Sequence, residues 1–222
     1  MTVDKRTIVT NLLDRHGRTY AEEAGIQLAD RPGPLYQLLV LATLLSTRIR
    51  AGVGVAAARE LFAAGCRTPA AMLKATWQDR VDALGRGHYR RYDERTATML
   101  GDGARLCADR WHGDLRRLHR ETGANPAAVR RELTAFPGIG PTGADIFLRE
   151  VQGVWSDVRP FLDRRAVSGA KRLRLPTDPN ALAALVRPVD VPRLAAALIR
   201  SSLAGEDAAT LGRERSLADA GR

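Results

Sequence analysis

The chain has 222 residues, and 45% of them are hydrophobic, which is enough to bury a substantial core and excludes wholesale disorder. Its 35 Lys and Arg residues against 25 Asp and Glu give a net charge of +10, so a polyanionic partner is expected, with nucleic acid first. The two cysteines, Cys66 and Cys107, are too few for a disulfide scaffold, a four-thiolate zinc site or an all-cysteine iron–sulfur cluster.

Helical periodicity runs through almost the whole chain, and few segments alternate apolar with polar residues. The sequence therefore predicts an all-α fold. The predicted helices cover about residues 4–16, 34–47, 54–64, 68–74, 78–84, 92–109, 126–135, 143–151, 163–173, 180–186 and 191–203.

Some of these helices carry further signals. The helix over 34–47 is apolar all round, which is typical of a central, buried helix. Thr68 before Pro69 and Asn125 before Pro126 each predict a capping side chain followed by proline at the first helical position. The last fifteen or so residues are small and polar, and we expect them to fray.

The membrane is not an expected partner. The longest nearly apolar stretch, residues 38–45, is about a third of a membrane span, and the N-terminus lacks the apolar core of a signal peptide. We therefore expect a cytoplasmic protein.

The most informative stretch is residues 136–144, which read F-P-G-I-G-P-T-G-A between two predicted helices. Gly138 and Gly140 permit backbone conformations that a side chain would block, and they let amide groups approach an anion closely. Ile139 between them is expected to plug the turn into the core. The pattern predicts a hairpin that grips a DNA phosphate without reading sequence, although a plain helix–helix turn also favours Pro and Gly.

Several motifs, in order, resemble those of the helix-hairpin-helix DNA glycosylases, the superfamily of endonuclease III. The family hairpin is similar to L-P-G-V-G-x-K-T-A and is followed about twenty residues later by a catalytic aspartate at a helix start; here P-F-L-D-R-R-A-V occupies residues 160–167. Residues 44–48 (L-L-S-T-R), 68–73 (T-P-A-A-M-L) and 87–90 (G-H-Y-R) also look similar to family motifs. The resemblance spans roughly residues 35–175.

The resemblance implies a two-lobed all-α fold with a central DNA-binding cleft. One lobe would be a helical barrel over residues 34–153 that ends in the hairpin, and the other would join residues 1–33 to 154–222. The implied activity is that of a base-excision repair glycosylase, which hydrolyses the N-glycosidic bond of a damaged or mismatched base flipped out of duplex DNA. A monomer at the nucleoid is implied.

Asp163 matches the catalytic aspartate of the family. A carboxylate beside C1′ would stabilise the positive charge left on the sugar and orient or deprotonate the attacking water. The other interpretation is that Asp163 only caps the helix that follows. The residues matching the DNA-binding hairpin are Gly138, Ile139, Gly140, Thr142 and Gly143.

Thr142 stands at the catalytic position where bifunctional relatives carry a lysine that forms a Schiff base. The chain has only three lysines, Lys5, Lys74 and Lys171, and arginine cannot replace them because it stays protonated. A water-using, monofunctional glycosylase is therefore expected, with Lys171 as a remote alternative amine.

Other departures from the family concern cofactors and base choice. No cysteine follows Cys107, so the family's iron–sulfur loop is absent or rebuilt. We therefore expect no cofactor and no metal. Whether a monovalent cation binds at the hairpin stays open. Arg213 and Arg215, or the cluster at 171–174, are candidates for that loop's DNA contacts, with a solvated charged face as the alternative. Ala42-Thr43 replaces the glutamate of adenine-excising relatives, which disfavours adenine excision.

Arg48 and His88 occupy the positions of the residues that fill the gap left by a flipped base, where the family has glutamine and an apolar wedge. Tyr36, Tyr89, Trp155 and Phe161 are candidates for stacking on the flipped base, but buried aromatic residues of a helical core look the same in sequence. Two rival functions stay open: a catalytically silent DNA-binding protein that recognises lesions, and an abasic-site lyase that uses another amine.

Overall fold

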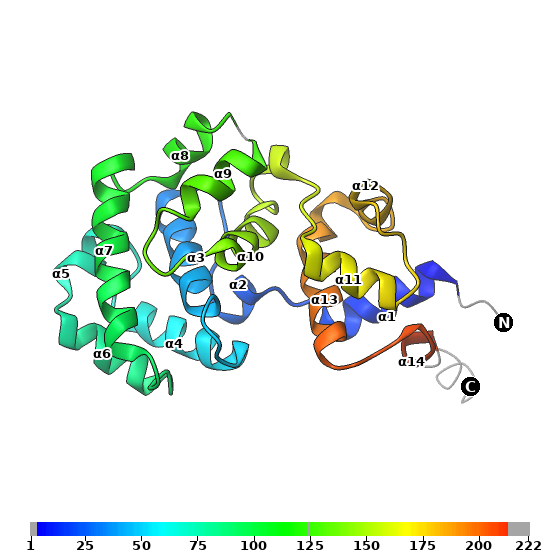
Figure 1. Cartoon of the computed structure of the whole chain (residues 1–222), viewed down its shortest axis with the longest axis horizontal. Coiled ribbons are helices and arrows are strands. Elements are labelled where there is room, and N and C mark those ends of the chain that lie inside the picture. The colour runs from blue at the N-terminus through cyan, green and yellow to red at the C-terminus, as the bar shows by residue number, and fades with distance from the viewer. Residues whose placement is uncertain (1–3, 124, 213–222) are drawn as a thin grey trace. The chain divides into compact units, whose positions relative to one another are not determined.

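The structure, a computed structural model, describes residues 4–123 and 125–212, and these residues form an all-α fold without a strand (Figure 1). The helices of the N-terminal half are α1 (Lys5–His16), α2 (Tyr20–Glu23), α3 (Pro32–Leu45), α4 (Ala51–Ala63), α5 (Pro69–Lys74), α6 (Trp77–Arg86) and α7 (Asp93–Trp111). Those of the C-terminal half are α8 (Leu115–Glu121), α9 (Pro126–Leu133), α10 (Pro141–Val151), η1 (Ser156–Val158), α11 (Arg164–Arg172), α12 (Pro179–Ala183), η2 (Pro188–Asp190), α13 (Val191–Leu203) and α14 (Ala208–Gly212).

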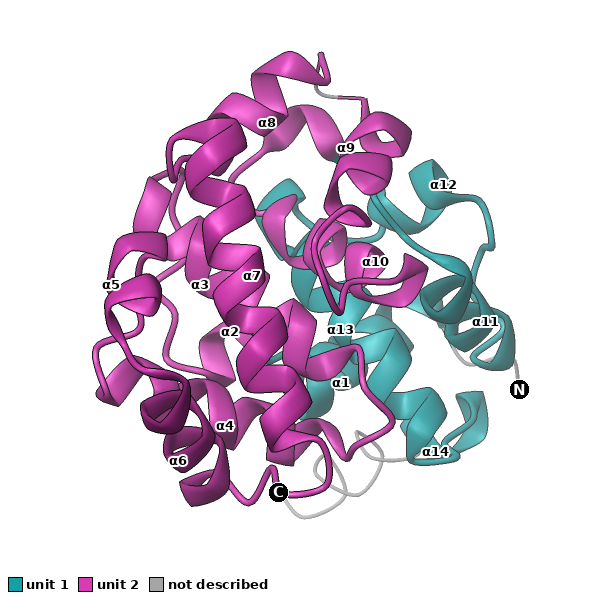
Figure 2. Cartoon of the chain, turned by 60° about the vertical axis from the view of Figure 1, so that its left-hand side comes forward, with its two compact units in different colours: residues 1–19, 159–222 teal, residues 20–158 magenta. Residues whose placement is uncertain are grey.

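The chain divides into two compact units, coloured separately in Figure 2. The larger unit is Tyr20–Val158, and the smaller unit joins Met1–Thr19 to Arg159–Arg222. The lobe predicted from the sequence begins at residue 34 and ends at residue 153, so its limits lie inside those of the larger unit.

Helix α3 forms the centre of the larger unit, where α4, α7, α8 and α10 all contact it (Figure 1). Its apolar residues are buried on every side of the helix, from Leu35 to Leu44. The prediction of a central, buried helix from its all-round apolar sequence is confirmed.

A buried arginine fixes α7 against α5 and α6. Arg80 is only 9% exposed, and its guanidinium donates to the carbonyl oxygens of Ala97 (2.9 Å), Met72 (3.0 Å) and Ala75 (2.8 Å). Each buried N–H that is paired in this way avoids the free-energy cost of an unsatisfied donor. These bonds hold α7 in place against α5 and α6.

The smaller unit is built on α13, against which both α1 and α11 pack. Its core is aliphatic; members from three different helices include Leu12, Ala170 and Leu198. Helices α11 and α13 touch at Gly169, where an added Cβ would overlap the backbone carbonyl of Leu198. This close approach requires glycine.

The helix signals in the sequence are largely confirmed. Thr68 accepts a hydrogen bond from the Ala71 amide, and Asn125 accepts from the amides of Ala127 and Ala128. The predicted start of α10 is wrong by two residues, because Pro141 occupies the first helical position, where its fixed φ and missing N–H cost nothing.

Three short helices, α2, α8 and α14, were not predicted. The expectation that the last fifteen or so residues fray is wrong for 208–212, which form α14, since Leu211 is fully buried in the core of the smaller unit. Within the described ranges, no helix is both long and apolar enough to cross a membrane.

Gly169→Ala is predicted to destabilise the smaller unit by about 1–3 kcal/mol, because the new methyl group meets backbone that cannot move aside. The free energy of unfolding from urea titration measures the effect. Gly85→Ala in α6 is the control: a Cβ there meets nothing within 4 Å, so this change should be neutral or stabilise the protein by up to about 1 kcal/mol. Equal effects of the two substitutions would contradict the packing described.

Candidate functional site

The hairpin between α9 and α10 turns its apolar residues inward and its glycines outward. Phe136 and Ile139 are 2% and 3% exposed, whereas Gly138 and Gly140 are exposed. The Ile139 amide closes the turn by donating to the Phe136 carbonyl at 3.0 Å, and Gly138 has a φ of +84°, a conformation that favours glycine. The predicted plug at Ile139 is confirmed, and the exposed surface of the hairpin is backbone.

Helix α10 begins directly behind this turn and carries no side-chain cap. Pro141 at its first position has no N–H, and the amides of Thr142 and Gly143 lie in the first turn, where no intrahelical acceptor is available. Thr142 is half-buried and Gly143 is buried, so only the first of these two positions is partly open to solvent. The helix dipole adds partial positive charge to this end of α10.

An open pocket of about 320 Å³ lies beside the hairpin and includes Gly138 and the predicted Arg48. Arg48 and Arg95 supply two guanidinium groups, and no carboxylate lines the pocket. Two cations without an acid favour an anionic occupant. The lining residues are Ser46, Thr47, Arg48, Tyr92, Arg95, Met99 and Gly138.

The sequence patterns did not single out three of these lining residues, Tyr92, Arg95 and Met99, although their spacing is that of one helix face. They stand at i, i+3 and i+7, which puts them on one face at the start of α7. The exposed Arg95 looks in sequence like any solvated helix arginine. Only the fold brings that face next to the hairpin, where Met99 Sδ and Thr43 Cγ2 lie within 3.1 Å of the position a Cβ would take at Gly138.

His88 is exposed at the tip of the turn after α6 and has a φ of +61°, an uncommon conformation for a residue other than glycine. The next residue, Tyr89, is completely buried, and its hydroxyl is hydrogen-bonded to Thr47 Oγ1. Thr47 Oγ1 in turn donates to the Leu44 carbonyl at 2.7 Å. The chain segments that carry Arg48 and His88 are therefore joined through their neighbours.

Three of the four candidate stacking residues belong to the core. Tyr36, Tyr89 and Trp155 are 1%, 0% and 2% exposed, so none offers an open ring face to a base. The Trp155 ring stacks on His119 with a centroid separation of 4.1 Å, and its Nε1 donates to Asp30 at 3.0 Å. Their stacking role is wrong for this structure; Phe161 is half-buried.

Asp163 belongs to the smaller unit and is half-buried at the start of α11. Its Oδ1 accepts a hydrogen bond from the Ala166 amide at 2.9 Å, so it caps the helix, and the preceding Leu162 is packed into the core of the unit. The cap and the buried neighbour fix the carboxylate in one position. Capping does not exclude catalysis, since a fixed carboxylate suits both roles.

Lys171 lies eight residues after Asp163, close to the other end of α11, and is exposed. At 1.5 Å per residue it is about 12 Å farther along the helix axis. Lys5 and Lys74 are exposed on α1 and α5. Among the described residues no lysine adjoins Asp163 on its helix. Arg213 and Arg215 lie outside the described residues.

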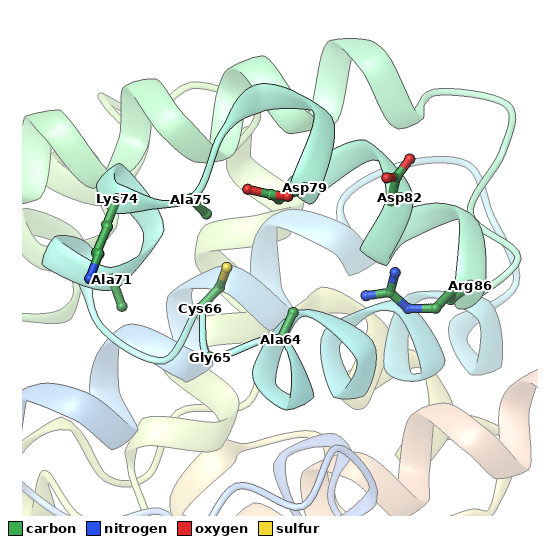
Figure 3. Close-up of a pocket in the computed structure, with 9 residues that line it drawn as sticks. All are labelled: Ala64, Gly65, Cys66, Ala71, Lys74, Ala75, Asp79, Asp82 and Arg86. Carbon is green, nitrogen blue, oxygen red and sulfur yellow. The ribbon is translucent and has the colours of Figure 1, made fainter.

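A second open pocket, of about 510 Å³, lies between the end of α4, α5 and α6 (Figure 3). Most of its charged groups have structural partners. Asp79 forms a capping box with Thr76, Asp82 accepts from Gln78 at 2.8 Å, and Arg86 pairs with Glu60 at 3.0 Å. The pocket contains none of the residues predicted to be catalytic or DNA-binding.

Neither cysteine is a candidate nucleophile, because both are buried. Burial raises the pKa of the Cys66 thiol, which lines the second pocket, and raises that of the Cys107 thiol to about 12. Both thiols are therefore protonated at neutral pH and poor nucleophiles. In the described part of the chain, no group of three or more His, Cys, Asp or Glu side chains could hold a metal ion. The expectation of no cofactor and the open question of a cation at the hairpin stay predictions.

Comparison with known proteins assigns no family: no family model and no curated protein matches the chain. Among solved structures, a trapped covalent intermediate of endonuclease III with DNA, an estranged-adenine complex, aligns with 89% of this chain and 86% of its own chain. The TM-score is 0.49 and the sequence identity is 15%.

Tyr89→Phe is predicted to lower the free energy of unfolding by about 1 kcal/mol, because it removes the hydroxyl that joins the His88 turn to Thr47. Urea titration measures the change. Tyr36→Phe is the matched control: Tyr36 is an equally buried tyrosine whose hydroxyl makes no hydrogen bond within residues 4–123 and 125–212, so its removal should be nearly neutral. A neutral Tyr89→Phe would mean that the bond does not join the two segments.

Proposed function

We propose that the chain is a DNA glycosylase of base-excision repair. It would bind duplex DNA that contains a damaged or mismatched base, flip the nucleotide out and hydrolyse the bond between base and deoxyribose. In this proposal the hairpin of the larger unit grips the DNA backbone and Asp163 of the smaller unit acts at the sugar.

The observation that carries the proposal is the surface around the hairpin. Gly138 and Gly140 expose backbone rather than side chains, and the adjoining pocket has two arginines and no carboxylate. A phosphate can approach such a surface closely, because amides, guanidinium groups and a helix N-terminus all favour negative charge. A plain helix–helix turn requires none of the arginines, so anion binding is the better explanation.

Asp163 would perform the chemistry on the flipped nucleotide. As the bond between C1′ and the base nitrogen breaks, its electron pair leaves with the base, which takes up a proton, and positive charge develops on the sugar. The carboxylate stabilises that charge. Water then forms the new C1′–O bond and gives a proton to Asp163, which leaves an abasic site.

The use of water follows from the missing amine. Thr142 stands where an attacking lysine would be expected, and Lys171 is about 12 Å along α11 from Asp163. A threonine hydroxyl cannot form a Schiff base. The products would therefore be a free base and an intact abasic strand.

Arg48 and His88 would help to open the duplex. Both side chains are exposed, and the bond between Thr47 and Tyr89 links the segments that carry them. An arginine can fill the space of a flipped base while donating hydrogen bonds to the base opposite, and a histidine ring can stack on a neighbour. Together they would hold the gap open during catalysis.

Asp163→Asn is predicted to abolish base release while leaving duplex affinity within a few-fold of the parent protein. Asparagine caps a helix about as well as aspartate, so the substitution removes the negative charge and retains the hydrogen bond to Ala166. Loss of a carboxylate that stabilises the transition state costs roughly 10²–10³-fold or more in rate. Single-turnover base release and equilibrium DNA binding are the two measurements.

The matched control is Asp178→Asn, which makes the same change at the cap of α12, where Asp178 Oδ1 accepts from Ala181 at 2.8 Å. It should keep the full rate of base release. Full activity in Asp163→Asn would contradict the catalytic assignment. Binding without base release by the parent protein, across a panel of duplexes that each carry one lesion, would favour the silent binder, for which Asp163 is only a helix cap.

The product is predicted to be an abasic site without strand cleavage. Duplexes should break only after hot alkali, and borohydride should trap no covalent adduct, because no amine adjoins Asp163 on its helix. Lys171→Arg is the control that removes the one lysine of α11 and keeps its charge. An adduct that disappears in Lys171→Arg would replace the water mechanism with a lyase mechanism.

A further inference from the structure

Helix α11 is strongly amphipathic. Its small residues Ala166, Gly169 and Ala170 are buried where it packs on α13, so its charged residues all lie on the opposite, exposed side. We call these cations, together with the one that follows the helix, the basic face of α11. Its members are Arg164, Arg165, Lys171, Arg172 and Arg174.

These cations have no acidic partners. Within residues 4–123 and 125–212, none of the five side chains forms an ion pair or a hydrogen bond, and α11 itself contains no Asp or Glu. Elsewhere the chain neutralises many of its arginines with carboxylates. The pairs include Arg15–Glu206, Arg86–Glu60, Arg110–Glu132, Arg116–Asp114 and Arg130–Asp145.

Helix stability explains only part of this arrangement. Lys171 and Arg172 in the last turn complement the partial negative charge of the helix C-terminus, but Arg164 and Arg165 in the first turn face the partial positive charge of the N-terminus and destabilise the helix. Acidic residues there would stabilise α11. Five like charges along one exposed face also repel one another. The face is therefore better explained by a partner with dense negative charge than by folding.

We propose that the basic face of α11 binds the phosphates of the DNA strand that leads away from the flipped nucleotide. This inference rests on the proposed function, because Asp163 caps the same helix and would place α11 beside the damaged site. From Arg164 to Arg172 the face extends about 12 Å along the helix axis, and Arg174 follows just beyond the helix end. One DNA strand carries a phosphate about every 3.4 Å along the duplex axis, so the face matches roughly four phosphates.

The experiment compares two triple variants that each remove three positive charges. One replaces Lys171, Arg172 and Arg174 with glutamine, and so leaves Asp163 and its neighbours unchanged. The control replaces Lys5, Arg6 and Arg105 with glutamine; these side chains are exposed on α1 and α7 and form no ion pair with any described residue. Binding to a lesion-containing duplex is measured from about 50 to 200 mM salt, and base release is measured in single turnover at saturating DNA.

The α11 variant should bind more weakly, by about tenfold at 0.1 M salt for each phosphate that it no longer neutralises, and its log–log salt slope should fall by about 0.9 for each such phosphate. Its rate of base release at saturation should match the parent, since the catalytic carboxylate is untouched. The control should keep the parent slope. Circular dichroism and urea titration verify that both variants fold.

Two results would overturn the inference. An unchanged salt slope in the α11 variant would mean that this face does not contact phosphates. An equal loss of affinity in the control would mean that net charge alone sets affinity. Failure of the parent protein to bind DNA would instead refute the proposed function, so the two failures are distinguishable.

Discussion

The close packing of α10 on the end of α3 is the constraint on which the surface around the hairpin depends. A Cβ at Gly143 would overlap Ser46 Oγ and lie within 3.2 Å of Ile139 Cγ2, so the contact is tight at a position that has no side chain. In the same turn Gly138 lies beside Thr43 and Met99, and it lines the pocket to which Arg48 and Arg95 belong. One close helix contact therefore assembles exposed backbone and two cations that lie far apart in sequence.

The distribution of charge separates structural arginines from available ones. Arg80 is buried and uses its donors on three carbonyl oxygens, and Arg130 is paired with Asp145 between α9 and α10. In contrast, the hairpin pocket and the basic face of α11 contain cations without an acid. A net charge of +10 alone predicts a polyanion; the unpaired positions indicate where on each unit it would bind.

Local chemistry made much of the fold predictable. Apolar periodicity located the long helices, and the Thr68-Pro69 and Asn125-Pro126 pairs marked helix starts, since capping acts between residues two or three apart. Helix α2 was missed because its stabilising group is remote: Glu150 accepts hydrogen bonds from the Tyr20 and Ala21 amides, 130 and 129 residues away. No local pattern contains that information.

The residues of the candidate site also differ in whether a local sequence pattern could identify them. The glycines and Ile139 could be placed from the hairpin motif, whereas the contribution of Arg95 depends on how α7 packs. Aromatic residues were the least predictable, because a ring that stacks on a base and a ring that fills a core look alike in sequence. Trp155 belongs to the second kind, with His119 on one face. The role of Asp163 stays a prediction, since the cap that it forms is seen at many helix starts.

The smaller unit is assembled from both parts of the chain that flank the larger one. Helix α1 packs on α13, and the whole of Tyr20–Val158 is synthesised between them. During translation the apolar residues Ile8, Val9 and Leu12 of α1 therefore stay uncovered until α13 has left the ribosome. The larger unit has all of its own helices earlier, so we expect it to fold first and the unit that carries Asp163 to fold last.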